Sequence, residues 1–344
     1  MGSVILAVDA MGGDHGPKVT LPAVLDLLRG HEDCSVILVG DETILQPMLP
    51  HRWRHSERLR LVHTDEVVLS DDPVMVALRK KKRSSMRLSL ELVECGEAQV
   101  AVSAGNTGAL MALAKNVLKT HPCIDRPAIL TSLPTMQGSC LMLDLGANVD
   151  AQADHLLQFA RMGDIVARGL LGQERPRVAL LNIGEEDIKG NEVIKKTHQL
   201  LQSSGLNYQG YIEGDGIFKG QADVVVCDGF VGNIALKVSE GVARMLAFRI
   251  RQEIESSWWR KALGGLAWPI WQGLKRQMDP ARYNGASLVG LRGLVVKSHG
   301  GANQAAFLNA LQVGLREVEH DVPGLMSREL AQDHEPEPGS DTRS

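Results

Sequence analysis

Five short turns rich in glycine, asparagine and aspartate contain the residues best suited to chemistry. They follow predicted strands, at residues 9–17, 104–108, 146–148, 228–233 and 298–303. A glycine-rich turn that enters a helix leaves backbone N–H groups pointing at one spot, where the helix dipole favours an anion. Because the carboxyl ends of parallel strands meet at one edge of a sheet, we expect the five turns to share a phosphate or carboxylate site.

The alternative explanation is structural, since glycine makes tight turns and asparagine caps helices. A single turn fits that explanation well, but five turns with one layout favour a binding site. The candidate binding residues in the turns are Asp9, Gly12, Gly13, His15, Gly105, Asn106, Thr107, Gly108, Asn148, Gly232, His299, Gly300 and Asn303.

A lysine also follows a predicted strand, Lys189 in the segment Leu181–Asn191. Three acidic residues flank it, which is typical of a solvated surface group. Beside an anion site, its ammonium group would instead hold the anion as a point charge.

The sequence lacks the residue patterns of several other kinds of catalytic and binding site. The sequence has no GxxxxGK[ST], GxSxG or HExxH pattern, which argues against a P-loop, a nucleophilic serine and a zinc site. The loop Gly214–Gly220 leads into a strand where a dinucleotide fingerprint requires a helix, and His51 and His55 lie in an arginine-rich stretch. The five cysteines are scattered singly, without a CxxC pair. We therefore expect no metal ion, no cofactor and no disulfide framework.

Apolar runs alternate with helical patterns from end to end, and these elements must position the turns. The predicted strands are Ser3–Val8, Ser35–Val39, Leu59–His63, Gln99–Ser103, Ala128–Leu133, Cys140–Leu145, Arg177–Ile183, Ala222–Cys227 and Gly293–Lys297. The predicted helices are Leu110–Leu118, Asp154–Leu170, Asn191–Gln202, Asn233–Glu255 and Asn303–Val318. Continuous apolar runs are typical of strands buried on both faces. The pattern predicts an α/β fold, with a doubly wound, mostly parallel sheet between layers of helices.

Length and composition limit the class of protein. The 344 residues include 37 Lys and Arg against 41 Asp and Glu, a net charge of −4, and 44% are hydrophobic. These values argue against a nucleic-acid-binding protein and against wholesale disorder. The sequence shows neither a membrane-spanning apolar run nor a signal peptide, so we expect a cytoplasmic protein. We expect residues 1–326 to form a single α/β catalytic unit, and residues 327–344 to form a disordered tail.

Tryptophan is concentrated in one segment. Four of the five tryptophans lie between residues 258 and 271, in a helical hairpin predicted at about residues 250–280 that protrudes from the fold. Tryptophan flanked by Lys and Arg suits a helix lying in a bilayer interface. The candidate membrane contacts are Trp258, Trp259, Leu263, Leu266, Trp268 and Trp271. Alternatively, the hairpin buries its apolar face in a dimer interface or in the core, and a dimer that presents the hairpin would satisfy both interpretations.

A run of basic residues is the other charge feature. It comprises Arg79, Lys80, Lys81 and Lys82, followed by Arg83. Such a run is usually a solvated helix start. It would also serve as a docking patch for an acidic partner.

Six segments carry a resemblance to a known family. They are Asp9–Pro17 (DAMGGDHGP), Val102–Met111 (VSAGNTGALM), Leu143–Asp150 (LDLGANVD), Asn182–Gly190 (NIGEEDIKG), Val226–Lys237 (VCDGFVGNIALK) and Lys297–Gln304 (KSHGGANQ). In this order they resemble the bacterial phosphate acyltransferases, which form acyl phosphate from acyl-(acyl-carrier protein) and inorganic phosphate in phospholipid synthesis.

The resemblance carries several expectations. It implies a three-layer fold similar to isopropylmalate dehydrogenase and phosphotransacetylase, a homodimer, and peripheral association with the inner face of the cell membrane. A membrane-bound glycerol-phosphate acyltransferase would then use the product. It also implies that Lys189 and Asn233 are the catalytic residues, and that the turns holding Asn106, Asn148 and His299 line the cleft.

A mechanism without an enzyme nucleophile follows as a hypothesis. Phosphate itself attacks the thioester, Lys189 and the Gly105–Gly108 amides hold the phosphate, and the Asn233 side chain or the amides at that helix start stabilise the oxyanion. Two alternatives stay open. One is a phosphotransacetylase-like enzyme acting on short acyl-coenzyme A, and the other is a non-catalytic membrane-surface adaptor for acyl-carrier protein.

Overall fold

A single mixed sheet of 11 strands forms the centre of the molecule. The computed structural model describes residues 3–260, 265, 273 and 283–332. The strands are β1 Val4–Asp9, β2 Cys34–Gly40, β3 Leu59–His63, β4 Val100–Ser103, β5 Ala128–Thr135, β6 Gly138–Leu143, β7 Val178–Leu181, β8 Tyr208–Ile212, β9 Val224–Val226, β10 Ala286–Val289 and β11 Leu294–Lys297. Their order across the sheet is β3-β2-β1-β4-β11-β10-β5-β6-β9-β7-β8.

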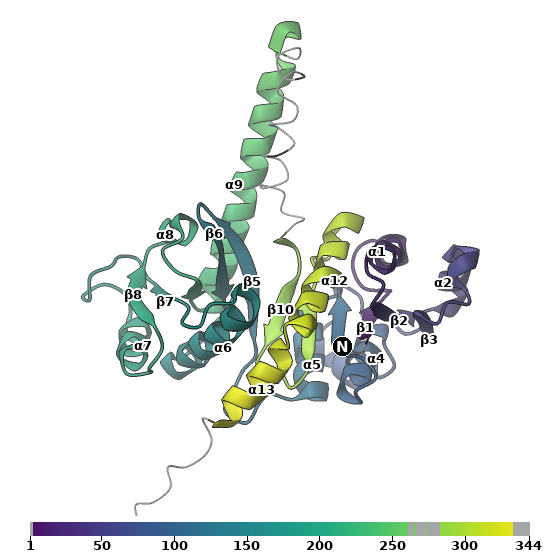
Figure 1. The fold of residues 1–344 in the computed structure, drawn as a ribbon, viewed down its shortest axis with the longest axis horizontal. Coiled ribbons are helices and arrows are strands. Elements are labelled where there is room, and N and C mark those ends of the chain that lie inside the picture. Colours follow the sequence, from purple (N-terminus) through teal and green to yellow (C-terminus); the bar gives the residue numbers. More distant parts are fainter. Residues whose placement is uncertain (1–2, 261–264, 266–272, 274–282, 333–344) are drawn as a thin grey trace, which may run out of the picture.

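Helices cover both faces of this sheet (Figure 1). They are α1 Pro17–Gly30, α2 Glu42–Met48, α3 Val74–Arg79, α4 Ser85–Glu94, α5 Thr107–Leu118, α6 Ala153–Leu171, α7 Glu192–Gln202, α8 Gly216–Lys219, α9 Gly229–Glu255, α12 Gln304–Glu319 and α13 Val322–Gln332. Alternate side chains of a strand point to opposite faces. Accordingly, Leu6 and Val8 pack in the core cluster that contains α1 and α12, whereas Ala7 packs in the cluster of Leu92 from α4. The predicted α/β fold with a mostly parallel sheet is confirmed.

The two halves of the sheet run in opposite directions. Strands β3, β2, β1, β4 and β11 are parallel to one another, and so are β6, β9, β7 and β8. Between these halves, β5 is antiparallel to both β6 and β10, and β10 is antiparallel to β11. The turns after β1, β4 and β11 therefore lie at one edge, and those after β6 and β9 at the other. The prediction that all five turns share one edge is wrong.

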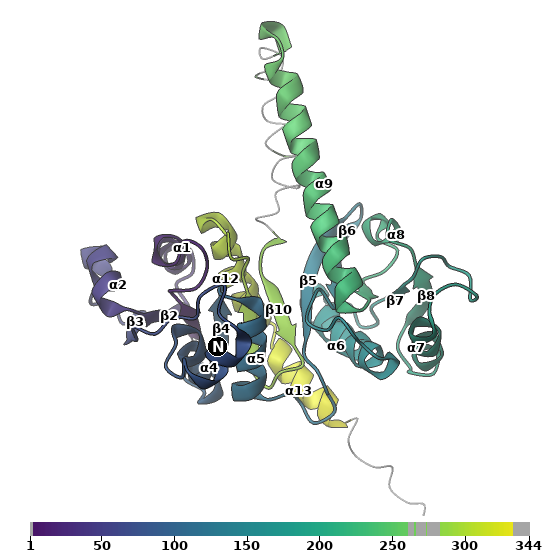
Figure 2. The ribbon, with the colours of Figure 1, turned by 180° about the vertical axis from the view of Figure 1, so that it is seen from behind.

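Helix α9 is the most unusual element. Its 27 residues rise out of the body between the two halves of the sheet (Figures 1 and 2), and only Gly229 and Gly232 are buried. The exposed apolar side chains along it are Phe230, Val231, Ile234, Val238, Val242, Met245, Leu246 and Phe248. The last residues of the helix, 250–255, overlap the start of the hairpin predicted at about residues 250–280. The helix begins at Gly229, four residues before the predicted start at Asn233.

Only part of the tryptophan segment is described. Trp258 and Trp259 are 82% and 49% exposed, whereas Leu263, Leu266, Trp268 and Trp271 lie outside the described residues. Among the described helices, none combines the length and the apolar character needed to cross a bilayer.

The C-terminal region differs from the prediction. Helix α13 continues through residues 327–332, where a disordered tail was expected, and its Met326 and Leu330 are buried against α6. Glu329 adds an ion pair with Arg168 of α6. The predicted tail is therefore wrong for residues 327–332, because these apolar and charged side chains have partners in α6. Residues 333–344 lie outside the described part of the chain.

Candidate active site

Three turns pack tightly against one another at the carboxyl ends of β1, β4 and β11. We call residues 9–16, 104–108 and 298–303 the first turn cluster. Asp14 N donates to Gly300 O at 2.9 Å. A Cβ atom on Gly12 would lie 2.8 Å from Gly105 N, and one on Gly13, which has φ of +89°, would lie 3.0 Å from Gly300 O. Glycine is thus required where these backbones meet, at the starts of α1, α5 and α12.

Asp9 lies beneath this cluster, and both oxygens of its carboxylate accept hydrogen bonds. Its carboxylate accepts hydrogen bonds from the hydroxyls of Ser85 and Ser103 at 2.6 and 2.7 Å, and from the amides of Met11 and Gly12 at 3.3 and 3.2 Å. Burial raises its pKa, while the four hydrogen bonds oppose that rise. Asp9 therefore joins β1 to α4 and β4 and fixes the shape of the cluster.

The two asparagines of the first turn cluster cap helices. Asn106 Oδ1 accepts from Ala109 N at 3.0 Å, and its Nδ2 donates to Ser70 O at 2.8 Å. Asn303 Oδ1 accepts from Ala306 N at 2.9 Å. These side chains therefore set the starts of α5 and α12, whereas Thr107 and Gly108 are exposed at the beginning of α5.

His299 and His15 lie at the surface of the same cluster. His299 Nδ1 accepts from Gly301 N at 3.1 Å, which leaves Nε2 to carry the proton of the neutral ring. Partial burial and the positive charges of Lys237 and Lys297 lower the pKa of His299. His15 is exposed in the turn before α1.

Sequence reasoning assigned no role to Lys297, which the fold places in the floor of the first turn cluster. It ends β11 and is only 9% exposed. The one signal in the sequence was a lysine at the end of an otherwise apolar strand, directly before a glycine-rich turn.

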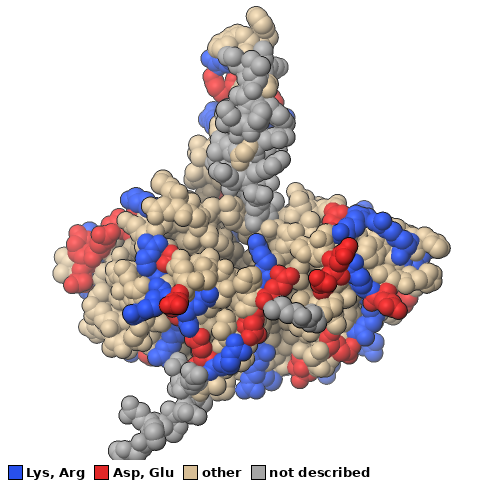
Figure 3. Space-filling view, viewed as in Figure 1, with Lys and Arg blue, Asp and Glu red and all other residues tan. Residues whose placement is uncertain are grey.

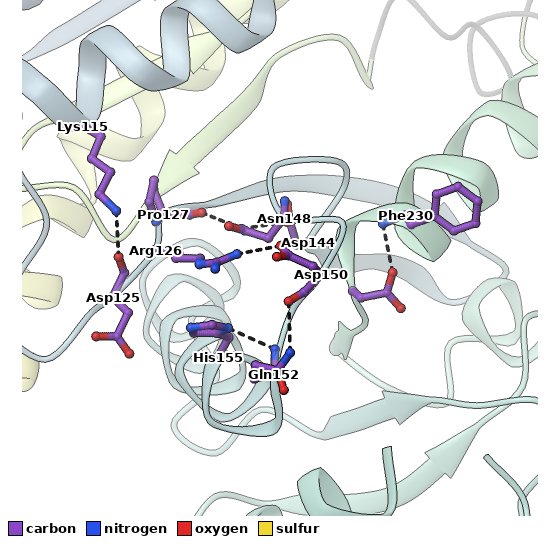
Figure 4. A network of polar contacts seen from close by, with 11 residues as sticks. Lys115, Asp125, Arg126, Pro127, Asp144, Asn148, Asp150, Gln152, His155 and Phe230 are labelled. Atoms are coloured by element: carbon purple, nitrogen blue, oxygen red, sulfur yellow. Dashed lines mark hydrogen bonds and ion pairs between the residues drawn. The ribbon is translucent and has the colours of Figure 1, made fainter. Parts of the chain in front are cut away.

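The turns after β6 and β9 form a second cluster, residues 144–149 and 228–233 (Figure 4). The Asp144 carboxylate accepts from the amides of Ile129, Ala147 and Asn148 at 2.9, 3.1 and 2.6 Å, and burial raises its pKa. Asn148 Nδ2 donates to Pro127 O at 2.9 Å and to Asp144 at 3.0 Å. Asn148 is buried, so its side chain holds the turn together.

The first turn of α9 is already occupied by a carboxylate. Asp228 caps it by accepting from Phe230 N and Val231 N at 2.9 and 3.0 Å. An oxyanion at these amides would meet that negative charge, so the amides are poorly placed to stabilise one. Gly232 is buried against Asp144, and the adjacent Asn233 is exposed and faces Gly146, where a Cβ would lie 3.7 Å from Asn233 Oδ1.

Helix α9 connects the two clusters. It starts in the second cluster at Gly229, and Lys237 and Arg244 follow about two and four turns later; their positive charges lower the pKa of His299 in the first cluster. Lys237 also acts on the pKa of Lys297. The charges of Lys237 and Arg244 on α9 therefore reach the first turn cluster, and Asn233 lies one turn before Lys237.

Lys189 lies elsewhere on the second half. It follows β7, and its Nζ pairs with Glu186 at 3.0 Å, with 42% of its side chain exposed. Figure 2 shows β7 and β4 on opposite sides of α9. Six strand spacings of about 4.8 Å separate β4 from β7, or about 29 Å, which exceeds the reach of a lysine. The structure does not bring Lys189 to the Gly105–Gly108 turn.

Only some residues of the basic run are exposed and available to a partner. Arg79 ends α3, and Lys80, Lys82 and Arg83 are exposed after it. Lys81 instead donates to Val67 O at 2.8 Å and pairs with Asp72, so it holds the loop before α3. On the face shown in Figure 3, basic and acidic side chains are interspersed over the body.

The three buried cysteines, Cys34, Cys140 and Cys227, are poorly suited to nucleophilic chemistry. Burial raises the pKa of Cys140 to about 12 and that of Cys227 well above its ordinary value. Across residues 3–260 and 283–332, the structure holds no group of three His, Cys, Asp or Glu side chains that could bind a metal ion.

Comparison with known proteins shows to which family the chain belongs. The model of the fatty acid synthesis protein family matches residues 4–324. The phosphate acyltransferase of Alcanivorax borkumensis is 58% identical over 331 residues, which cover 96% of this chain and 98% of that protein. The phosphate acyltransferase of Methylococcus capsulatus is 53% identical, over 92% of this chain and 94% of its own length.

Solved structures show the same fold at low sequence identity. A phosphotransacetylase from Streptococcus pyogenes matches with a TM-score of 0.61 and 16% identity, over 93% of this chain and 95% of its own. The EutD phosphotransacetylase from Staphylococcus aureus matches with a TM-score of 0.56 and 18% identity, over 90% and 94%. The chain therefore belongs to the phosphate acyltransferase family of fatty acid synthesis proteins and is an acyltransferase enzyme.

Proposed function

We propose that the protein transfers a long-chain acyl group from acyl-carrier protein to inorganic phosphate, and so supplies acyl phosphate for phospholipid synthesis. The observation that carries the proposal is the first turn cluster. Three helices, α1, α5 and α12, begin there, and their N-terminal dipoles favour an anion at one place. The names of the relatives support phosphate as that anion.

The reaction requires no enzyme nucleophile. An oxygen of hydrogen phosphate attacks the thioester carbonyl carbon, the new C–O bond forms, and the C–S bond breaks. The proton of the phosphate passes to the leaving thiolate, so that the products are acyl phosphate and the free thiol. The high pKa values of Cys140 and Cys227 agree with this route. The task of the protein is to hold phosphate against the carbonyl carbon and to stabilise the oxyanion.

We assign Asn233 to a contact with the thioester. Its side chain is exposed at the base of α9 and has no hydrogen-bond partner among the described residues. It lies one helical turn from Lys237, whose charge lowers the pKa of Lys297 in the first turn cluster. We assign the oxyanion contact to the Asn233 amide. Lys189, at the same edge of the second half, would supply positive charge on the thioester side.

The exposed part of the basic run borders the first turn cluster. Val74 of α3 would contact a Cβ on Gly108 at 3.3 Å, and α3 ends at Arg79. Leu69 and Met75 beside it are 55% and 50% exposed. An apolar surface with a basic rim suits an acidic carrier protein, whose charges would meet Arg79, Lys80 and Lys82. Lys81 serves this surface indirectly, through its structural contacts.

The exposed stripe on α9 supports a homodimer. Ile234, Val238 and Val242 recur every four residues and so form one face. An apolar face of this length on a water-exposed helix is best explained by a second copy packed against it. Farther along, exposed Trp258 and Trp259 would contact an anionic membrane surface, where a membrane-bound glycerol-phosphate acyltransferase would collect the amphiphilic product.

The direct test is a turnover assay. Purified protein, phosphate and a long-chain acyl thioester on carrier protein should give acyl phosphate, trapped with hydroxylamine, and an equal amount of free thiol. A clear preference for short acyl-coenzyme A would show a phosphotransacetylase-like enzyme instead. Binding to carrier protein and vesicles without any turnover would show an adaptor.

Variants test the assigned residues. Lys189→Ala and Asn233→Ala should each lower kcat by about 10²-fold, as the loss of one oxyanion contact does. Lys195→Ala and Asn207→Ala, which remove the same groups elsewhere on the second half, should retain the rate. A folded Lys189→Ala or Asn233→Ala variant with the normal rate would remove that residue from the chemistry.

A further inference from the structure

Lys297 is a buried cation that makes no ion pair with an acidic residue in the described part of the chain. Its Nζ donates to the carbonyl oxygen of Ser298 and lies 3.5 Å from that of Ala104, so it touches two of the three turns of the first turn cluster. An ammonium group has three donors, and two neutral carbonyls leave one unused. Within the described ranges, no carboxylate lies at ion-pair distance from Lys297.

The nearby acids do not neutralise this cation. Asp9 acts on Lys297 at longer range, but its four hydrogen bonds come from two hydroxyls and two amides. Asp9 and Asp14 both raise the pKa of Lys297, whereas the positive charge of Lys237 on α9 lowers it. A buried charge that lacks a close counter-ion is costly. The arrangement is therefore stabilised when an anion enters.

We infer that Lys297 binds the inorganic phosphate, donating from its free N–H to a phosphate oxygen above the floor of the first turn cluster. The inference deepens the proposed function and rests on it for the identity of the anion. The sheet order supports it, because β7, the strand that precedes Lys189, is six strand spacings, or about 29 Å, from β4. Lys297, in contrast, ends the strand next to β4.

The site has the parts that phosphate binding needs. Backbone amides at the starts of α1, α5 and α12 supply neutral donors, and Lys297 supplies the charge. On the side of the second half, Lys237 of α9 is the residue whose charge acts on Lys297.

The state of this lysine depends on pH. Burial lowers the pKa of Lys297 to about 8, with Asp9 and Asp14 raising it and Lys237 lowering it further. The neighbouring His299 is the other titratable group at this turn, and its own pKa is lowered, so it is neutral at this pH. Phosphate affinity should therefore fall as the pH rises above 8, because free Lys297 then loses its proton.

Kinetics of substituted full-length protein test the assignment. Lys297→Met should raise the KM for phosphate by about 10- to 100-fold, the usual effect of losing a charge-assisted hydrogen bond, and leave the KM for the acyl thioester nearly unchanged. Lys297→Arg should retain much of the phosphate affinity and lose its decline above pH 8. The control is Lys115→Met, because Lys115 Nζ also donates to a backbone carbonyl, Asp125 O at 3.0 Å (Figure 4), and lies in the last turn of α5, whereas the first turn cluster is at the start of that helix.

Calorimetry of the unsubstituted protein gives a second measurement that needs no variant. Phosphate binding should raise the pKa of Lys297, so titration near pH 8 in buffers of different ionisation enthalpy should show proton uptake. An unchanged phosphate KM in folded Lys297→Met, or binding without proton uptake beyond that of phosphate itself, would overturn the inference. Lysine-dependent phosphate binding without any acyl phosphate formation would refute only the proposed function.

Discussion

Glu317 offers the sharpest test of how this fold tolerates a buried charge. It lies on α12, is 1% exposed, and accepts a hydrogen bond from Ser287 of β10. Its second carboxylate oxygen has no hydrogen-bond partner among the residues that the structure describes. Strand β10 joins the two opposed halves of the sheet, so this carboxyl group sits at their junction. We predict that Glu317→Gln stabilises the protein at alkaline pH.

The size of the effect follows from the pKa. Burial raises the pKa of Glu317 from its ordinary value of 4.5 to about 7. A raised pKa in an acid means that the folded state holds its proton longer than the unfolded state, so stability falls as the pH rises. At 1.36 kcal/mol for each pH unit, the full penalty is about 3 kcal/mol, and about 2 kcal/mol of it appears between pH 5.5 and 8.5. Glutamine does not ionise and escapes this penalty.

Urea unfolding at pH 5.5 and 8.5 measures the difference. The free energy of unfolding of Glu317→Gln relative to the unsubstituted protein should grow by about 2 kcal/mol across this range. Glu319→Gln removes an exposed acid from the same helix and should show no such growth. A Glu317→Gln difference that is constant with pH would show that Glu317 is ionised without cost, and the reasoning from burial would be wrong.

Three further predictions concern the site, the metal question and the protruding helix. Gly12→Ala should abolish activity or folding, since its Cβ would lie 2.8 Å from Gly105 N; full activity would show that the turns separate freely. Turnover should survive EDTA, and loss of activity that a divalent ion restores would contradict the metal-free mechanism. Val238→Asp with Val242→Asp should reduce the mass in light scattering from a dimer to 37.4 kDa, and an intact dimer would exclude this face of α9 as the interface.

Strand positions could be predicted well because both faces of this sheet are covered. Runs such as Val36–Val39 are buried on both sides and are therefore apolar throughout. Strand β10 was missed because its four residues, ASLV, are too short to show a pattern. Helix α1 was missed because Pro17 and Pro22 suggest a loop, although Pro17 occupies the first turn and is tolerated there.

Strand direction was the main failure, and a signal for it existed. Only Met136 and Gln137 separate β5 from β6, and parallel strands need a crossover of a dozen or more residues. That short connection reverses the chain and places the turns after β6 and β9 at the opposite edge. The later strands pair in ways that no local pattern encodes.

The residues of the site were predicted better than the roles of their side chains. Glycine-rich turns were placed correctly after their strands, yet Asn106 and Asn148 use their side chains to hold the backbone. Asparagine serves both to cap helices and to bind ligands, so the sequence alone does not distinguish the two roles. Burial of Lys297 depends on β4 and α9, which lie far from it along the chain.

The length of helix α9 also determines how far its far end lies from the body of the protein. From Lys237 to Glu255 at its end, the helix advances 1.5 Å per residue, or about 27 Å. If its far end rests on a bilayer, the cleft stands that far above the lipid surface. The protruding helix would then act as a spacer between the cleft and the membrane, and its length would limit the size of a carrier domain that could enter from the membrane side.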